Sequence, residues 1–370
     1  MAATYSLLVC DLRTDRLLER LQLTGCSYDD YIGKTGSLSG TVPIPDRATA
    51  RRVRDTMLPG RTAVHLERRT DAGAALVWSG VLWVRTPTAD DRGLYTCPII
   101  AAGFESWLRG HRMLTDTLAW AGADQLAIAR ALVAYAQGVP GGDLGIEMDA
   151  GQMSGVLRDR TYLATDLPRV GDLLDQLAAV DGGPEWRIQV YADSTGVRHR
   201  ALRLGTPLLA SGSGDVVLDQ PGPVRGHALP EDATAMATAW QSRGATINSN
   251  QAVDSLPIMS PLLVSTSDIA AGWPRLDGSS DYSTVTDPAT LASHATADLA
   301  RARRTVAIPT VTILSSETQP PLGSYIRLRI AAGDLWYSEG LDARYRVVGL
   351  KCTPAEQDRP DLTDLYLEAT

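Results

Sequence analysis

The sequence has 370 residues, of which 44% are hydrophobic and 21% charged, and its mean hydropathy is −0.08. These values are typical of a globular protein and exclude a mainly disordered chain, and the length favours two to four domains over one. The 35 Lys and Arg residues against 43 Asp and Glu residues give a net charge of −8, which argues against general nucleic-acid binding because that function needs an electropositive surface.

The N-terminal segment does not have the pattern of a targeting sequence. MAATYSLLVCDLRTDR meets its first charge after ten residues and lacks a basic start. No apolar run approaches the roughly 20 residues needed to span a bilayer. We therefore expect a protein that folds in a cytoplasm and has no membrane segment. Lys34 and Lys351 are the only lysines, and this bias towards Arg indicates a GC-rich genome.

Residues 1–105 are predicted to be rich in β-strands. Short apolar or alternating runs are separated by polar turns, which is the pattern of half-buried strands. A short helix is expected at Ala48–Met57, before Pro59-Gly60. The predicted strands are Tyr5–Cys10, Leu17–Leu23, Gly36–Pro45, Thr62–Arg68, Ala75–Arg85 and Leu94–Ala101. Such a set suggests a small barrel or sandwich.

Residues 104–220 combine helices with strands. Asp124–Gln137 has helical spacing of its apolar residues, with Asp124 as N-cap and Gly138 at the end. Asp166–Val180 is predicted as a second helix with Pro168 in its first turn. Two strands are expected after it, at Trp186–Tyr191 and Arg198–Leu204.

The C-terminal part returns to strands after a third helix. Asp287 and Pro288 are the expected N-cap and first helical residue, and a local basic patch is expected at the helix end. That patch would consist of Arg301, Arg303 and Arg304. The predicted strands are Val306–Leu314, Tyr325–Ile330, Arg344–Lys351 and Leu362–Ala369. Ser260–Gly278 reads as a loop, and the fold of residues 224–262 is not predicted.

This layout predicts an α+β chain that is mostly β, with two small β-barrel or sandwich modules at its ends and α+β modules between them. The predicted domains are a β-barrel at residues 1–107, an α+β domain at 108–220, a mixed insert with a helix at 288–303 in residues 221–305, and a second β-barrel at 306–370.

Several patterns resemble active-site motifs without completing one. Ala210–Asp215 (ASGSGD) is Gly-rich, but no Lys-Ser/Thr follows, so a hairpin or flexible loop is favoured over a phosphate loop. No G-x-S-x-G elbow is present. The histidines lie far apart in the sequence and are predicted to be structural rather than metal ligands; they are His65, His111, His199, His227 and His294.

Paired carboxylates of the kind that a glycosidase needs have only weak candidates. Glu105 lies beside Phe104 and Trp107, and Glu185 lies beside Trp186. Neighbouring residues on a strand face opposite ways, so these adjacencies carry little weight. We predict no catalytic, cofactor-binding or metal-binding residues, no cofactor and no enzymatic activity.

The tryptophans and cysteines are also interpreted as structural. Eight tryptophans are scattered through the chain, which favours core or interface packing over sugar binding. The cysteines form no C-x-x-C pair and are interpreted as small buried apolar side chains, with a Cys10–Cys26 disulfide as the alternative. The four cysteines are Cys10, Cys26, Cys97 and Cys352.

The order of several segments is informative. In the N-terminal half these segments are Gly36–Pro45 (GSLSGTVPIP), Pro59–Arg68 (PGRTAVHLER), Val77–Val84 (VWSGVLWV) and Tyr95–Arg112 (YTCPIIAAGFESWLRGHR). This order resembles the phage tail-hub family, whose members form the baseplate hub or its equivalent in long-tailed phages. Asp159–Ile188 and Gly272–Arg301 are similar to the middle of minor tail proteins from phages of GC-rich actinobacterial hosts.

The resemblance implies two barrels, near residues 1–107 and 306–370, that alternate around the tail axis, so that three copies present six barrels to a six-fold tube. The implied function is that of a structural virion protein, a tail-tip hub subunit whose ring, a trimer, joins the tail tube or distal tail ring to the tail tip or fibres. The implied partners are sister copies, the distal tail protein, the tail tube and tape-measure or tail-tip proteins, with no specific nucleic-acid binding. The implied location is the phage tail, after assembly in the host bacterial cytoplasm.

Two alternatives stay open at this point. One is a receptor- or carbohydrate-binding tail component, which a cluster of exposed tryptophans would support. The other is a tail-associated cell-wall hydrolase, which would need a catalytic module that the sequence does not reveal.

Overall fold

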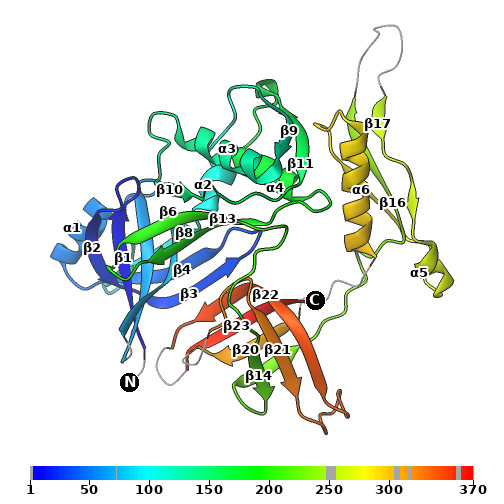
Figure 1. Ribbon diagram of the computed structural model, residues 1–370. Coiled ribbons are helices and arrows are strands. Elements are labelled where there is room, and N and C mark those ends of the chain that lie inside the picture. Colours follow the sequence, from blue (N-terminus) through cyan, green and yellow to red (C-terminus); the bar gives the residue numbers. More distant parts are fainter. Residues whose placement is uncertain are drawn as a thin grey trace. The chain divides into compact units, whose positions relative to one another are not determined.

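The computed structural model describes residues 3–71, 73–149, 151–246, 256–303, 309–315, 319–355 and 360–369. Their contacts group the chain into two compact units (Figure 1). Unit 1 comprises Met1–Leu174, Pro184–Ala228 and Thr310–Thr370, and unit 2 comprises Asp175–Gly183 and Leu229–Pro309. No helix among the described residues is long and apolar enough to cross a membrane.

The N-terminal strands of unit 1 form one side of a large sheet. In the order in which they pair they are β2 (Leu17–Gln22), β1 (Thr4–Asp11), β5 (Thr62–Thr70), β6 (Gly73–Arg85), β8 (Tyr95–Ala102), β4 (Ser37–Ile44) and β3 (Thr24–Tyr31). The short strand β7 (Thr88–Ala89) pairs with β8. Their inward residues alternate with exposed ones, as in β4, where Leu38 and Val42 are buried.

Helix α1 (Arg47–Thr56) joins two of these strands and contacts β2 and β4. It begins where the Asp46 carboxylate accepts a hydrogen bond from the Thr49 backbone N–H at 2.7 Å, which satisfies one of the free N–H groups of the first turn. Val53 is buried on one side of the helix, while the arginines of the opposite side are exposed.

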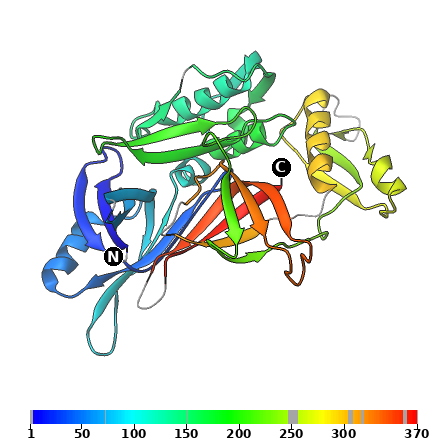
Figure 2. The same ribbon diagram turned by 60° about the horizontal axis from the view of Figure 1, so that its bottom comes forward.

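The C-terminal strands continue the same sheet. Gly349–Cys352 of β22 (Leu341–Thr353) pairs antiparallel with Tyr28–Tyr31 of β3. Figure 2 shows these red and orange strands next to the blue N-terminal ones. Beyond β22 the sheet continues through β23 (Leu362–Ala369), β20 (Thr310–Leu314) and β15 (Val224–Ala228), while β21 (Tyr325–Ile330) pairs with β22 and β14 (Val216–Gln220) pairs with β21.

The α+β, mostly β architecture agrees with the sequence prediction, but its subdivision differs. The two terminal strand sets were expected as separate small barrels; they form one continuous sheet with one hydrophobic core, and no ladder among the described residues closes a barrel. The strands β14 and β15, which the sequence placed in the middle modules, belong to the C-terminal set. Their partners lie far along the chain, since Val216 of β14 pairs with Ile326 of β21 and Val224 of β15 pairs with Ile313 of β20, and local patterning does not reveal such pairs.

The α+β part of unit 1 is built around a hairpin of β12 (Trp186–Ala192) and β13 (Arg198–Leu204). The predicted helix with Asp124 as N-cap and Gly138 at its end is confirmed as α3 (Gln125–Gln137). The other elements are α2 (Glu105–Gly110), β9 (Leu118–Asp124), β10 (Ile146–Met148), β11 (Leu157–Tyr162) and the first half of α4 (Val170–Ala178), whose residues from Asp175 on belong to unit 2. Strand β10 pairs with β13, and β9 pairs with β11.

The predicted start of the second helix at Asp166 is wrong. A 3₁₀ turn at Ala164–Asp166 ends at Leu167, whose φ of 45° is incompatible with a right-handed helix. The α-helix therefore begins only at Val170. Pro168 lies in the connection before the helix rather than in its first turn.

Unit 2 is a small sheet with one long helix. The central strand β16 (Ala239–Thr246) pairs with β17 (Pro257–Met259), β18 (Leu263–Val264) and β19 (Asp277–Asp281), and it contacts α6 (Pro288–Ala302). The third predicted helix is confirmed, with Asp287 as its N-cap. The predicted loop Ser260–Gly278 is wrong in part, because it contains β18 and α5 (Thr266–Ala270) and includes the first residues of β19.

A small residue is required where the two strand sets join. A Cβ atom at Gly349 would clash with the Tyr31 ring, which packs against Tyr366 with 5.7 Å between ring centroids. We predict that Gly349→Ala lowers the free energy of unfolding by about 1–3 kcal/mol, the usual cost of overpacking. Urea unfolding measures this change. Gly226→Ala, in β15 where the added Cβ meets open space, is the matched control and should change stability by less than about 0.5 kcal/mol; equal effects of the two substitutions would contradict the prediction.

Candidate functional site

The most distinctive polar feature of unit 1 is a set of charged side chains around the β12–β13 hairpin. Arg198 and Arg200 are two residues apart on β13 and therefore point to the same face of the hairpin. Arg187 lies on β12, and Glu185 is the residue directly before the first residue of that strand. We call the contacts of these side chains with the rest of unit 1 the charged junction.

The first part of the charged junction is centred on Asp15, in the turn between β1 and β2. Its Oδ1 accepts hydrogen bonds from Arg200 at 2.7 Å and from His65 at 2.9 Å, and its Oδ2 accepts one from Arg198 at 2.6 Å. Arg200 also donates to the carbonyl groups of Leu12 and Leu144, at 2.7 and 2.6 Å. Three hydrogen bonds thus hold a guanidinium whose residue is only 5% exposed.

The protonation states of this group follow from its contacts. Burial raises the pKa of Asp15, but His65, Arg200 and Arg198 outweigh it and lower the pKa to about 2. Burial lowers the pKa of His65 despite the nearby Asp15. A neutral His65 donates from Nε2 to the Asp15 carboxylate, so its Nδ1 accepts the hydrogen bond of the Ser79 hydroxyl at 2.8 Å.

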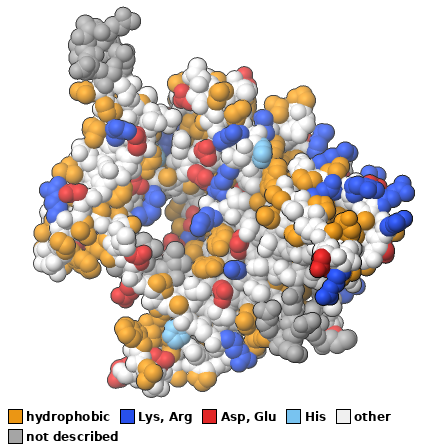
Figure 3. Space-filling model, turned by 180° about the vertical axis from the view of Figure 1, so that it is seen from behind, with side chains coloured by type: hydrophobic (Ala, Val, Ile, Leu, Met, Phe, Trp, Pro, Cys, Tyr) orange, Lys and Arg blue, Asp and Glu red, His pale blue; other side chains and the backbone are white. Residues whose placement is uncertain are grey.

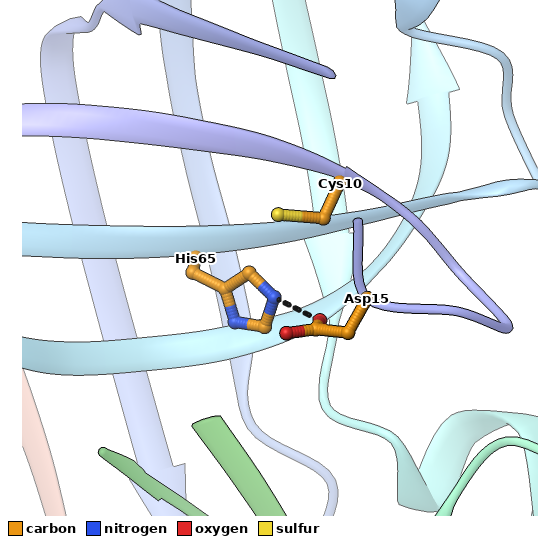
Figure 4. A group of neighbouring side chains, drawn as sticks. All are labelled: Cys10, Asp15 and His65. Atoms are coloured by element: carbon orange, nitrogen blue, oxygen red, sulfur yellow. Dashed lines mark hydrogen bonds and ion pairs between the residues drawn. The ribbon is translucent and has the colours of Figure 1, made fainter. Parts of the chain in front are cut away.

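Ser79, His65 and Asp15 are hydrogen-bonded in the order of a Ser–His–Asp triad. The Cys10 thiol, the Asp15 carboxylate and the His65 imidazole also lie close enough together to bind a metal ion (Figure 4). The details favour a structural role. His65 is fully buried, and Ser79 lies opposite it within the β5–β6 ladder. Burial raises the pKa of the Cys10 thiol to about 11, and the same Sγ atom lies 3.4 Å from an Arg198 nitrogen. A cation among these residues would also face two guanidinium groups.

The second part of the charged junction links the hairpin to β3 and α2. Arg187 donates to the Asp30 carboxylate at 2.5 Å. The Ile188 backbone N–H donates to Glu105 Oε1 at 2.7 Å. Glu105 is 5% exposed, and burial, together with the negative charge of Asp30, raises the pKa of its carboxyl group from 4.5 to about 7.

The third part links the hairpin to the C-terminal strands. Arg346 of β22 is 1% exposed and donates to both oxygens of Glu185, at 2.5 and 2.7 Å, and to Glu368 at 2.7 Å. Burial disfavours its charged form, but the hydrogen bonds and negative charges of the two glutamates raise the pKa of Arg346 above its usual value. Glu185 also accepts the Leu209 backbone N–H. One hairpin is therefore held by buried charge to both strand sets.

The two carboxylates that were weak glycosidase candidates form hydrogen bonds within unit 1. Glu105 and Glu185 each bind a partner of unit 1, so neither is aimed at a substrate in the described structure. The sequence did not single out Asp15, Arg198 or Arg200. A signal was present, since the sequence Arg-His-Arg on a strand places two arginines on one face.

The histidines lie in five different surroundings. Besides His65, His199 donates a hydrogen bond to the Glu147 carboxylate at 2.7 Å, and His227 donates one to the Gln220 side-chain oxygen at 2.6 Å. His111 stacks on Trp83, and His294 is buried in unit 2 and stacks on Tyr282. The absence of any metal or cofactor site stays a prediction.

The basic patch expected at the end of α6 is largely neutralised. Arg303 pairs with Asp268 at 2.6 Å, and Arg301 lies 3.6 Å from Asp298. Arg304 lies outside the described residues.

The cysteine interpretation is confirmed, because all four are buried and none forms a disulfide. The tryptophans divide into two kinds. Trp78, Trp107 and Trp186 are buried in unit 1, whereas Trp273 and Trp336 are 44% and 85% exposed.

The fold has known relatives among solved structures, although the sequence matches no protein-family model and no curated protein. The tail protein from Neisseria meningitidis MC58 has a TM-score of 0.60 and 13% identity, covering 100% of this chain and 97% of that one. The 43 kDa tail protein of prophage MuSo2 from Shewanella oneidensis has a TM-score of 0.60 and 11% identity, covering 98% of both chains. The chain has the fold of phage tail proteins. The Francisella PdpA–VgrG complex in its half-lidded form contains a further similar chain, with a TM-score of 0.58, 6% identity and coverage of 100% of this chain and 58% of that one.

The charged junction predicts a specific pattern of stability. Asp15→Ala leaves Arg200 buried without its carboxylate, and we expect a loss of about 3–5 kcal/mol in unfolding free energy, measured by urea titration. Arg200→Met in the same background should recover part of this loss because it removes the uncompensated charge. Asp55→Ala, which removes an exposed pair with Arg51, is the control and should cost at most about 1 kcal/mol. A loss at Asp15 no larger than the control would show that the junction does not hold the hairpin.

Glu105 makes stability depend on pH. Its pKa of about 7 in the folded protein exceeds the 4.5 of the free group, so the folded state binds more protons between these values, and stability falls as pH rises from about 4.5 to 7. Glu105→Gln resembles the protonated group and keeps an acceptor for Ile188. We expect the variant to gain stability relative to the wild type at pH 8 and to differ little at pH 4.5, as shown by melting temperatures at both values. A difference that is the same at both pH values would contradict this assignment.

Proposed function

We propose that the protein is a structural component of a phage tail, a hub subunit that acts by assembling into a ring and not by catalysis. The observation that carries this proposal is the fold, which is shared with two phage tail proteins along practically the whole length of both chains. The likeness to a chain of the PdpA–VgrG complex supports the hub part of the proposal.

The continuous sheet of unit 1 supports a role in lateral assembly. The pairing of β3 with β22 joins the eight N-terminal strands, β1 to β8, to the six C-terminal strands. Copies arranged around an axis would alternate these two kinds of strand set. Three copies would then present six strand sets to a six-fold tail tube, which is the symmetry argument for a trimer.

The charged junction suits such a role because it restricts the orientation of the parts it joins. A buried guanidinium has to meet its own carboxylates, and an alternative orientation of the hairpin would leave it unpaired at a cost of several kcal/mol. A ring subunit must present its two lateral surfaces at a constant angle, since otherwise the ring does not close.

The partners and the location belong to the same proposal. The ring would join the tail tube or distal tail ring to the tail tip or fibres, in the virion, after assembly in the cytoplasm of the host. The neighbouring proteins would be the distal tail protein and tape-measure or tail-tip proteins. A GC-rich genome is proposed from residue usage, and an actinobacterial host from the resemblance of Asp159–Ile188 and Gly272–Arg301 to minor tail proteins.

Deletion of the gene from the phage or prophage that encodes it tests this function. We expect filled heads without complete tails in electron micrographs, with tails restored by the wild-type gene in trans. In restored particles, gold-labelled antibody against a tag on the protein should mark one end of the tail, and cryo-electron microscopy should show three copies in a ring. Complete, infective tails formed without the protein would refute the proposal.

A further inference from the structure

The turn between β21 and β22 exposes two large apolar side chains. Leu335 is 105% exposed, as much as in an extended peptide, and Trp336 is 85% exposed. Single exposed leucines are common on protein surfaces. Two adjacent large apolar side chains at the tip of a hairpin are instead typical of an interaction site, because binding removes their apolar surface from water. Tryptophan is also the residue type that most often dominates binding energy at protein interfaces.

The turn holds this pair in a defined conformation. The Asp334 carboxylate accepts the backbone N–H groups of Trp336 and Tyr337, at 2.9 and 3.0 Å. Gly333 donates its N–H to the Ser338 carbonyl at 2.9 Å, and Gly340 donates to the Tyr337 carbonyl at 2.8 Å. Because the turn is ordered by its own hydrogen bonds, binding would cost less conformational entropy than for a flexible loop.

A hollow on the N-terminal part of unit 1 has the properties of a matching site. It has a volume of about 610 Å³, within the range that holds a group larger than one indole ring. Leu12, Trp107 and Leu144 contribute its apolar lining, and its charged lining consists of Arg13 and Arg61 together with Asp11 and Asp143. An indole that enters it would meet apolar side chains and guanidinium groups, which both favour an aromatic ring.

The surroundings of the tip and of the hollow have opposite charge tendencies. Residues 306–370 contain nine acidic and six basic residues, a difference of −3, and Asp334 and Glu339 belong to the tip itself. The helix α1 contains four arginines and one aspartate. Figure 3 shows basic side chains gathered at the edge of the molecule where α1 lies. Long-range attraction would therefore bring the C-terminal strand set of one copy towards the N-terminal set of another.

We infer that the hairpin tip Gly333–Gly340 docks into this hollow on a second copy of the chain. The turn between β1 and β2 lines the hollow, and Figures 1 and 2 draw it far from the turn between β21 and β22 within unit 1, so one copy cannot bring the tip and the hollow together by itself. A contact between two different surfaces of identical copies is heterologous, and its repetition produces a closed ring when the rotation between copies is right. The inference rests on the proposed ring and identifies which surfaces form it.

Cysteine cross-linking of the assembled full-length protein tests this contact. Ser338→Cys with Thr14→Cys places one thiol on the exposed tip and one at the hollow, and keeps Leu335 and Trp336 in place. The native cysteines are all buried and should not react. Under mild oxidation we expect covalent dimers and trimers on non-reducing gels, and none from the matched pair Ser338→Cys with Leu94→Cys, whose second thiol is exposed on the β7–β8 turn outside the hollow.

A second measurement tests whether assembly depends on Trp336 in a variant that keeps the fold. Native mass spectrometry should show at least a tenfold lower trimer fraction for Trp336→Ala at the concentration where the wild type is half assembled, with an unchanged circular dichroism spectrum. A wild-type trimer that neither cross-links through the designed pair nor depends on Trp336 would refute the docking contact and leave the proposed function standing. A wild-type protein that shows no self-association in solution or in particles, and no cross-link, would refute both.

Discussion

Two buried guanidinium groups constrain the arrangement of unit 1 more than any other interaction. Arg200 and Arg346 are 5% and 1% exposed, and each is surrounded by carboxylate or carbonyl oxygens from a different part of the chain. A buried pair contributes little net stability, because desolvation offsets much of the attraction. Its effect is on specificity. Arg200 of the hairpin binds Asp15 of the N-terminal strand set, and Glu185, directly before the hairpin, binds Arg346 of the C-terminal set, so only one placement of the hairpin pairs both guanidinium groups.

The same constraint accounts for the perturbed pKa values of unit 1 by internal contacts. In an active site, a perturbed carboxylate or imidazole has an unsatisfied atom aimed at the substrate. Here the pKa values of Asp15, His65 and Glu105 are perturbed, but each group has an internal partner: a guanidinium, a serine hydroxyl or a backbone N–H. Burial and internal pairing therefore account for these pKa values, as expected of contacts that fix the position of one structural element against another.

Local patterns predicted the elements whose energetics are local. The helix caps at Asp124 and Asp287 act within a few residues, and both were predicted at the right positions. Strand β3 was missed because its sequence, TGCSYDDY, has neither regular alternation nor many β-branched residues. It pairs with the neighbouring β4, where Asp29 binds the Ser37 hydroxyl and backbone, but it also pairs with the distant β22, and Asp30 binds the distant Arg187. The contacts with β22 and Arg187 are tertiary, so no window along the sequence contains them.

The charged junction was beyond sequence reasoning for a related reason. An arginine on a strand is ordinarily assigned to the solvent side, and the alternation rule therefore makes the face of Arg198 and Arg200 the outer one. That assignment fails when a carboxylate in a distant turn supplies the missing countercharge, and Asp15 lies in a turn that looks like any polar hairpin connection. On β13, Arg198 and Arg200 share one face with Leu202 and Leu204, which are both buried. Two arginines in line with buried leucines, as in RHRALRL, therefore indicate a buried ionic contact.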